Sequence, residues 1–251
     1  MRIAVAGATG RVGHHAVEVL EERGHDVVAI SRSRGVDVIT GDGLAEALSG
    51  VESIIDAATG PSPEQEPATR FFTTAARNLQ EGGQQAGARR IVVVSIIGTD
   101  KFTAGYGAAK NAHEQAHAAG PVPAHILRAA QFHEFVAQLM DWGRQGDVVY
   151  VPTMRTQLVA ARTVAEVLAD LATAPEPTAA GTPVSEVAGP REESLVDMAT
   201  LLATRRGDPV KIVGVSDPAD PDNLNGTGGL LPGPDAILAG PTFEEWLDAT
   251  S

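Results

Sequence analysis

The stretch at residues 105–117, GYGAAKNAHEQAH, carries two patterns that could each do chemistry. Tyr106 and Lys110 are spaced i, i+4, so on a helix they share one face. A phenol has a pKa near ~10, and a neighbouring ammonium lowers it toward the range in which the group can transfer a proton. His113 and His117 frame the pattern H-E-x-x-H, in which two imidazoles bind zinc and the glutamate acts as a base.

The zinc interpretation of this stretch has little further support. All four residues lie on one helical stripe, so helical phase does not exclude a metal. A zinc site needs a third ligand, however, and no downstream histidine or glutamate stands in a recognisable third-ligand pattern. The neighbourhood is rich in alanine, and histidines near the C-terminus of a helix suit its dipole. We therefore predict no metal site and take the tyrosine and lysine as the reacting pair.

The elements that position this stretch alternate between strand and helix. Short apolar runs predict strands, and apolar residues at helical spacing predict the helices between them. This alternation is typical of βαβ units with right-handed crossovers, and it predicts a doubly wound parallel sheet. The expected strands are 3–6, 26–30, 36–39, 53–56, 90–95 and 124–128, and the expected helices are 12–22, 44–48, 68–86 and 106–118.

The sequence GATGRVG connects the first expected strand to the first expected helix. Gly7 can take the sharp turn, Gly10 leaves room for a pyrophosphate near the backbone, and Gly13 lets the helix pack close to the strand. The helix N-terminus offers unpaired N–H groups and the positive end of a dipole. This context, and not the glycines alone, predicts a dinucleotide site.

The residues after the second strand indicate which dinucleotide binds. An acidic residue there would accept from the ribose 2′-hydroxyl of NAD, but this chain has Ser31 and Arg32 instead. A guanidinium can pair with a 2′-phosphate, and Arg11 in the glycine loop can add a second positive charge. We therefore expect NADP(H) to be preferred over NAD(H).

The amino-acid composition of the chain disfavours some classes of binding partner and excludes some kinds of site. The chain of 251 residues has 19 basic and 32 acidic side chains and a formal charge of −13, which disfavours nucleic acids and anionic membranes. There is no cysteine, so disulfides, thiolate metal sites and a thiol nucleophile are excluded. We recognise neither a secretory leader nor a run of 18 apolar residues and expect a cytoplasmic protein with a small-molecule substrate.

Together these motifs resemble the short-chain dehydrogenase/reductase superfamily, in particular its atypical branch of NmrA-like, NAD(P)H-binding proteins. The resemblance rests on GATGRVG, SRSR at 31–34, VVVSIIGTD at 92–100, GYGAAK at 105–110 and LRAAQFHEF at 127–135. VAGP at 187–190 and the closing FEEWL extend it over nearly the whole chain. It implies a Rossmann-type core, residues 1–130, and a small substrate-binding or lid region, residues 131–251, with segments that return to the core sheet.

The resemblance also implies a role for individual residues. Tyr106 would be the proton donor, Lys110 its partner and a ligand of cofactor ribose, and Ser95 the hydroxyl that orients the substrate oxygen. The hydride would go to a small carbonyl, enone or quinone. The implied cofactor-binding residues are Gly7, Thr9, Gly10, Arg11, Val12, Gly13, Ser31, Arg32, Asp42, Ala57, Ala58, Thr59, Lys110, Gln131 and Phe132.

Two other functions remain compatible with the motifs. Many members of this branch have lost active-site residues, so a non-catalytic NADP(H)-binding redox sensor is the first alternative. A sugar-nucleotide epimerase or dehydratase is the second, although the Ser-Arg pair and the short C-terminal half speak against it. By analogy, the long helix at 68–86 offers a surface for a homodimer.

Overall fold

The computed structural model describes residues 1–175, 181–216, 220 and 223–250. The chain forms two compact units, each built from two segments. The first contains Met1–Arg128 and Val164–Ser185, and the second contains Ala129–Thr163 and Glu186–Ser251. The sequence analysis predicts a boundary between the core and the C-terminal region at residue 130, with later segments that return to the core. In the structure the first unit ends at Arg128 and the chain returns to it at Val164. No helix among the described residues is long and apolar enough to cross a membrane.

The central sheet has seven strands in the order β12-β9-β5-β4-β3-β1-β2. The pairs β1/β2, β1/β3, β3/β4 and β9/β12 are parallel. This is the doubly wound α/β fold that the alternating pattern predicts. The strands are β1 (Arg2–Ala6), β2 (Asp26–Ile30), β3 (Ser53–Asp56), β4 (Arg90–Ile96), β5 (Ala124–Ala129), β9 (Val184–Ala188) and β12 (Ile237–Leu238).

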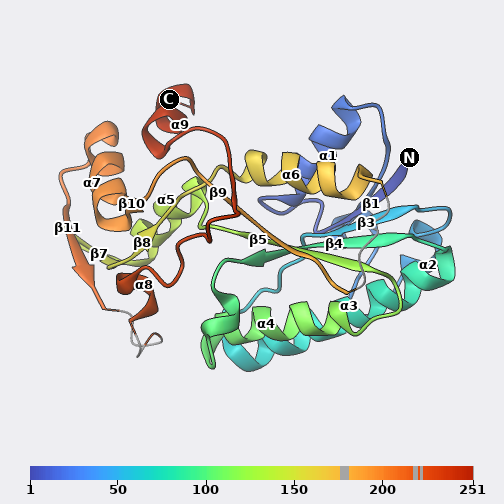
Figure 1. The fold of residues 1–251 in the computed structure, drawn as a ribbon. Helices are drawn as coiled ribbons and strands as arrows, with labels where there is room; N and C mark the ends of the chain where they lie inside the picture. The colour runs from blue at the N-terminus through green and yellow to red at the C-terminus, as the bar shows by residue number, and fades with distance from the viewer. Residues whose placement is uncertain (176–180, 217–219, 221–222, 251) are drawn as a thin grey trace. The chain divides into compact units, whose positions relative to one another are not determined.

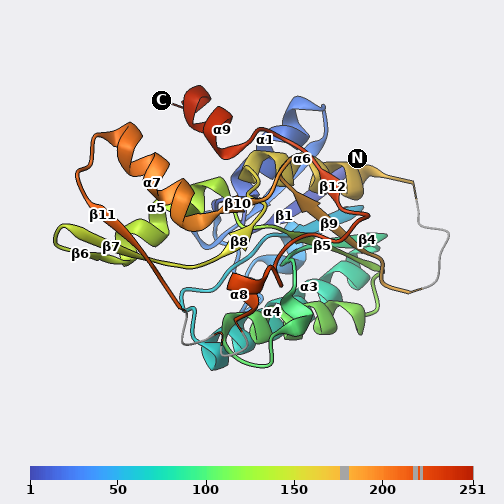
Figure 2. The same cartoon turned by 60° about the vertical axis from the view of Figure 1, so that its left-hand side comes forward.

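Helices cover both faces of this sheet in the first unit. Figure 1 shows α3 and α4 beneath the sheet and α1 and α6 above it, and the turned view of Figure 2 agrees. Strands covered on both faces are buried, and all four residues of β3 are buried, including the polar Ser53 and Asp56 at its ends. The helices are α1 (Gly13–Glu22), α2 (Leu44–Ala47), α3 (Gln65–Ala86), α4 (Gly105–Ala118) and α6 (Ala161–Thr173), with 3₁₀ turns at Arg32–Arg34 and Thr99–Lys101.

The expected strand at 36–39 is wrong. The apolar alternation there forms a turn, in which the Asp37 side chain accepts from the backbone N–H of Ile39 at 2.7 Å. The backbone of Asp37 also donates to Asp42 (3.0 Å) and accepts from Gly41 (2.9 Å). An aspartate that bonds the backbone two residues on favours a turn over a strand, and this local preference outweighs the apolar pattern.

The second unit has its own small sheets and apolar core. β7 (Val148–Pro152) pairs in parallel with β11 (Lys211–Val215) and antiparallel with β6 (Arg144–Gln145). β8 (Arg155–Thr156) pairs antiparallel with β10 (Glu193–Ser194). The core of this unit includes Val136, Met140, Leu202 and Phe243, and its helices are α5 (His133–Trp142), α7 (Leu195–Arg206), α8 (Leu224–Thr227) and α9 (Phe243–Thr250).

Candidate functional site

The glycine loop between β1 and α1 leaves no room for side chains at two positions. Gly7 has a φ of 76°, and a Cβ there would lie 2.5 Å from the carbonyl oxygen of Ala57. A Cβ at Gly13 would lie 2.1 Å from the carbonyl oxygen of Gly7. The first turn of α1 has no acidic side chain. The loop therefore brings backbone close together at a helix N-terminus, whose dipole favours an anion.

A pocket of about 370 Å³ opens beside this loop, where β1, β2 and β3 end. This is the position at which doubly wound sheets bind their ligands. Phe71 and Pro61 form part of its wall, and so does the turn that contains Asp37. The predicted cofactor residues that line it are Gly7, Thr9, Gly10, Ser31, Arg32, Ala57, Ala58 and Thr59.

Arg32 is exposed at the edge of this pocket. Its guanidinium makes no hydrogen bond or ion pair with another described residue. Ser31 and Ser33 lie beside it, with their hydroxyl oxygens 3.0 Å apart. A cation and two hydroxyls therefore meet where an anionic group of a bound ligand can reach them.

Other predicted cofactor residues lie outside the lining of this pocket among the described residues. Asp42 accepts from the Thr40 hydroxyl at 2.8 Å and closes the turn that begins at Asp37. Gln131 belongs to the second unit, where it accepts from the Thr156 hydroxyl at 2.5 Å. The residues that also fall outside the lining are Arg11, Val12, Gly13, Lys110 and Phe132.

Asp56, at the end of β3, is the centre of a buried polar cluster that the sequence analysis did not find. Its Oδ2 atom lies 2.9 Å from Nε2 of His113 and 2.9 Å from Nε2 of His117. Burial alone would raise the pKa of this carboxyl, but bonding to the two histidines outweighs burial and holds the pKa well below its usual range. The only sequence signal was an aspartate that ends an otherwise apolar strand.

The outer nitrogens of the two imidazoles face hydrogen-bond donors. Lys110 Nζ lies 2.9 Å from Nδ1 of His113, and the amide nitrogen of Gln80 lies 3.4 Å from Nδ1 of His117. Nδ1 of His113 therefore accepts from Lys110. The Gln80 amide donates its two hydrogens to the His117 and Val122 carbonyls (3.1 and 3.2 Å), so Nδ1 of His117 faces a donor nitrogen rather than an acceptor. Each Nε2–H donates to Asp56. A neutral imidazole that binds a metal through Nε2 carries its proton on Nδ1 and donates it to an acceptor. Here both Nδ1 atoms face donors and both Nε2 atoms face Asp56, which is the opposite arrangement. This favours a hydrogen-bonded cluster over a metal site.

Lys110 is fully buried and bonds away from Tyr106. Its Nζ donates to the Val94 carbonyl (2.7 Å) and to His113, and it lies 4.5 Å from the centre of the Phe72 ring. Burial lowers its pKa to about 8, although the charges of Asp56 and Glu114 act in the opposite direction. Burial and the Lys110 charge together lower the pKa of His113 to about 3, so this imidazole is neutral at pH 7.

Ser95 is buried at the carboxyl end of β4, and its hydroxyl has a partner within the protein. It donates to Oε1 of Glu114 at 2.5 Å. Arg128 holds the same carboxylate with two bonds, from Nε (3.0 Å) and Nη2 (2.8 Å), and also bonds Asp100 (2.9 Å). The glutamate of the H-E-x-x-H pattern is thus the anion of an internal ion pair.

Tyr106, at the start of α4, is the predicted catalytic residue whose hydroxyl reaches a pocket-lining side chain. Its Oη lies 3.2 Å from Oγ1 of Thr59, and its ring meets the edge of Phe72. Burial raises the pKa of Tyr106, and the bond to Thr59 only partly offsets this. In this structure the phenol keeps its proton at neutral pH and is suited to donating a hydrogen bond.

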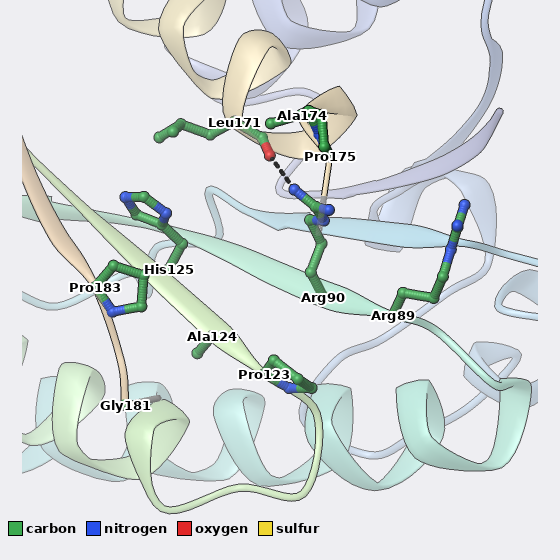
Figure 3. A pocket seen from close by; sticks show the side chains of 10 residues that line it. All are labelled: Arg89, Arg90, Pro123, Ala124, His125, Leu171, Ala174, Pro175, Gly181 and Pro183. Carbon is green, nitrogen blue, oxygen red and sulfur yellow. Dashed lines mark hydrogen bonds between the residues drawn. The ribbon is translucent and has the colours of Figure 1, made fainter. Parts of the chain in front are cut away.

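A second pocket, of about 430 Å³, lies where β4 and β5 begin (Figure 3). Arg90 crosses it and donates to the Leu171 carbonyl at 2.9 Å. Arg89 and His125 also line it, and His125 lies 2.9 Å from the Ser185 hydroxyl. No residue predicted for catalysis or cofactor binding lies here, and the amino ends of parallel strands are not where this fold class binds nucleotides.

The sequence matches a family model described as NAD(P)H-binding over residues 7–175. Among curated proteins, it is 34% identical over 119 residues to a 3-diazoavenalumate denitrifying reductase of a Streptomyces species, covering 38% of each chain. It is 31% identical over 112 residues to a 3-beta-hydroxysteroid dehydrogenase of Mycolicibacterium neoaurum, covering 36% of this chain and 31% of the relative. The chain therefore matches less than two fifths of the length of either relative.

Solved structures share the fold across almost the whole chain. An NADPH-dependent quinone oxidoreductase from Escherichia coli, complexed with NADPH, superposes with a TM-score of 0.75 at 18% identity and covers 99% of both chains. MoeE5 in complex with UDP-glucose and NAD superposes with a TM-score of 0.69 at 19% identity and covers 100% of both. At these identities the likeness shows the fold alone.

Proposed function

Because this chain belongs to the NAD(P)H-binding family, of the NmrA-like kind, we propose that it is an NADPH-dependent oxidoreductase that transfers hydride to a small carbonyl, enone or quinone. The observation that carries this proposal is the Thr59–Tyr106 hydroxyl pair. Thr59 lines the pocket beside the glycine loop, so a proton donor stands at the place where a nucleotide would bind. Hydride transfer is supported by the reductase and dehydrogenase among the relatives, whereas the substrate class follows from the resemblance of the motifs.

The position of the pocket supports a dinucleotide as its ligand. Gly7, Thr9 and Gly10 line it beside the N-terminus of α1, whose positive dipole end favours an anion, and close backbone packing at Gly7 and Gly13 holds this loop in place. These residues would hold the pyrophosphate, and Arg32 with Ser31 would hold a 2′-phosphate. The bound cofactor supplies the hydride, while the protein binds and orients the two reactants.

Tyr106 would act as the proton donor in the reduction. The phenol is protonated at neutral pH, so it can donate a hydrogen bond to an oxygen that gains negative charge as hydride arrives. Burial raises its pKa and makes it a weaker acid, so transfer of the proton would require this pKa to fall when cofactor and substrate bind. Thr59 would orient the phenol. Ser95 and Lys110 would serve in their predicted roles only after exchanging their present partners, Glu114 and His113.

This engagement of Ser95 and Lys110 is the one observation that favours a non-catalytic NADP(H) sensor. A carbonyl-orienting hydroxyl that donates to an internal carboxylate is not available to a substrate. The sensor needs the same cofactor pocket but no proton donor. Multiple-turnover chemistry separates the two functions.

The test is NADPH consumption by the wild-type protein with a panel of quinones, enones, aldehydes and ketones. We expect oxidation of many equivalents of NADPH with at least one member of the panel. NADPH binding without turnover of any member would reject the oxidoreductase proposal and favour the sensor.

A further inference from the structure

Asp56 uses both of its carboxylate oxygens, and the two oxygens bond different parts of the first unit. Oδ1 accepts from the backbone N–H of Ala58 at 3.0 Å, inside the turn that follows β3. Oδ2 accepts from His113 and His117, two successive positions on the buried face of α4. One side chain thus ties the turn at Ala57–Thr59 to α4.

The turn that Asp56 holds is in direct contact with the glycine loop. The backbone N–H of Ala57 donates to Ala6 at 3.0 Å, and a Cβ on Gly7 would meet Ala57 and Ala58 backbone atoms within 2.8 Å. Little space separates the two segments, so a small displacement of the turn changes the wall of the pocket. Ala57, Ala58 and Thr59 all line that pocket.

The Ala57–Thr59 turn also contacts α4 at a second point, through Thr59. Thr59 bonds Tyr106 near the start of this helix, while Asp56 bonds the histidines two and three turns further along it. The turn is therefore fixed to α4 at two separated points. Sliding or rotation of this helix against the turn would break the buried bonds from the two histidines to Asp56 or the bond between Tyr106 and the exposed Thr59 hydroxyl.

Stability alone explains this arrangement poorly. Asp56 and the two histidines are at most 1% exposed, so their polar atoms have to be satisfied within the protein. Well-packed apolar side chains of the same volume are often as stabilising as a buried ionic cluster. A role in fixing geometry accounts for a polar cluster at this position.

We propose that Asp56, His113 and His117 are positioning residues for dinucleotide binding, which set the spacing between the Ala57–Thr59 turn and the glycine loop. The histidines of the H-E-x-x-H pattern thereby gain a role that involves no metal. This inference rests on nucleotide binding at the glycine loop and not on the proposed reaction. It is tested by binding, so it can fail or stand independently of turnover.

The experiment measures the Kd for NADPH by calorimetry in four variants, alongside the melting temperature of each. Asp56→Asn removes the charge, and His113→Leu removes one donor to Asp56. His113→Gln places an amide nitrogen near the position of Nε2 and can still donate. Leu168→Ala is the matched control: it removes buried apolar volume in the first unit from α6, none of whose residues lines the nucleotide pocket.

We expect Asp56→Asn and His113→Leu to raise the Kd tenfold or more. His113→Gln should restore it to within about threefold of wild type, and Leu168→Ala should leave it unchanged despite a comparable loss of melting temperature. If Asp56→Asn does not fold, the contrast between leucine and glutamine at position 113 decides. The inference is overturned if the Kd follows melting temperature equally in the control, if glutamine and leucine behave alike, or if Asp56→Asn binds NADPH as wild type does.

Discussion

The hydroxyl of Tyr106 lies 3.2 Å from the hydroxyl of Thr59, which lines the pocket beside the glycine loop. The lysine one helical turn away bonds His113 and the Val94 carbonyl instead. The tyrosine therefore meets the nucleotide pocket through a threonine on a neighbouring strand end. This relationship determines which residues the following predictions address.

Arg32→Ala should weaken NADPH binding about tenfold or more and leave NADH binding unchanged. A charge-assisted bond to a phosphate contributes about 1.5–3 kcal/mol, which corresponds to that range. Arg34→Ala is the matched control, because Arg34 lies in the same 3₁₀ turn but does not line the pocket. Kd values for both nucleotides give the answer. Equal losses with NADPH and NADH would contradict a 2′-phosphate role.

Gly13→Ala should abolish nucleotide binding and lower the free energy of unfolding. Its Cβ would lie 2.1 Å from the Gly7 carbonyl oxygen, so the loop or α1 has to move. Gly10→Ala is a graded comparison, since its Cβ would lie 3.1 Å from the same atom. Denaturant unfolding should rank wild type above Gly10→Ala and Gly10→Ala above Gly13→Ala. Wild-type stability in Gly13→Ala would contradict the close packing.

The stability of the protein should fall as the pH is lowered from about 6.5 to about 3, in part because of His113. In the folded state burial holds the pKa of His113 at about 3, while an unfolded histidine titrates near ~6.5. Between these values the unfolded chain binds a proton that the folded chain does not, and each such group removes about 1.4 kcal/mol per pH unit.

His113→Gln should make this decline shallower, because glutamine does not take up a proton in this range. Free energies of unfolding from urea titrations between pH 4 and pH 7 provide the measurement. Identical slopes for wild type and His113→Gln would show that His113 is not held neutral in the folded protein. Asp56 contributes in the same direction at lower pH, because its folded pKa lies below the unfolded value.

Zinc should not stabilise the protein through the H-E-x-x-H pattern. The three ligand-type side chains Asp56, His113 and His117 lie together, but both Nδ1 atoms face donor nitrogens rather than the acceptor that a metal-bound imidazole needs. Melting temperatures with EDTA and with added zinc should agree within error. A zinc-dependent rise that His117→Gln removes would show that the cluster rearranges to bind metal.

The strand and helix pattern and the glycine loop could be predicted from local sequence, because each depends on periodicity or on the steric needs of one turn. The turn at 36–39 could not, since one aspartate side chain decided it. The hydrogen-bond partners of Lys110 and Ser95 could not be predicted from the local sequence either. Helical phase places Tyr106, Lys110, His113 and His117 on one stripe, but only the tertiary fold brings Asp56 from β3 against that stripe.

Hydride transfer with Tyr106 as the proton donor is tested by measuring kcat of the Tyr106→Phe variant with the best substrate of the panel. Phenylalanine keeps the ring against Phe72 and removes only the hydroxyl. General acid catalysis contributes about 10²–10⁴-fold, so we predict a fall in kcat of at least about 100-fold at saturating NADPH. An unchanged kcat would contradict the account, because it would show that the substrate gains its proton without Tyr106.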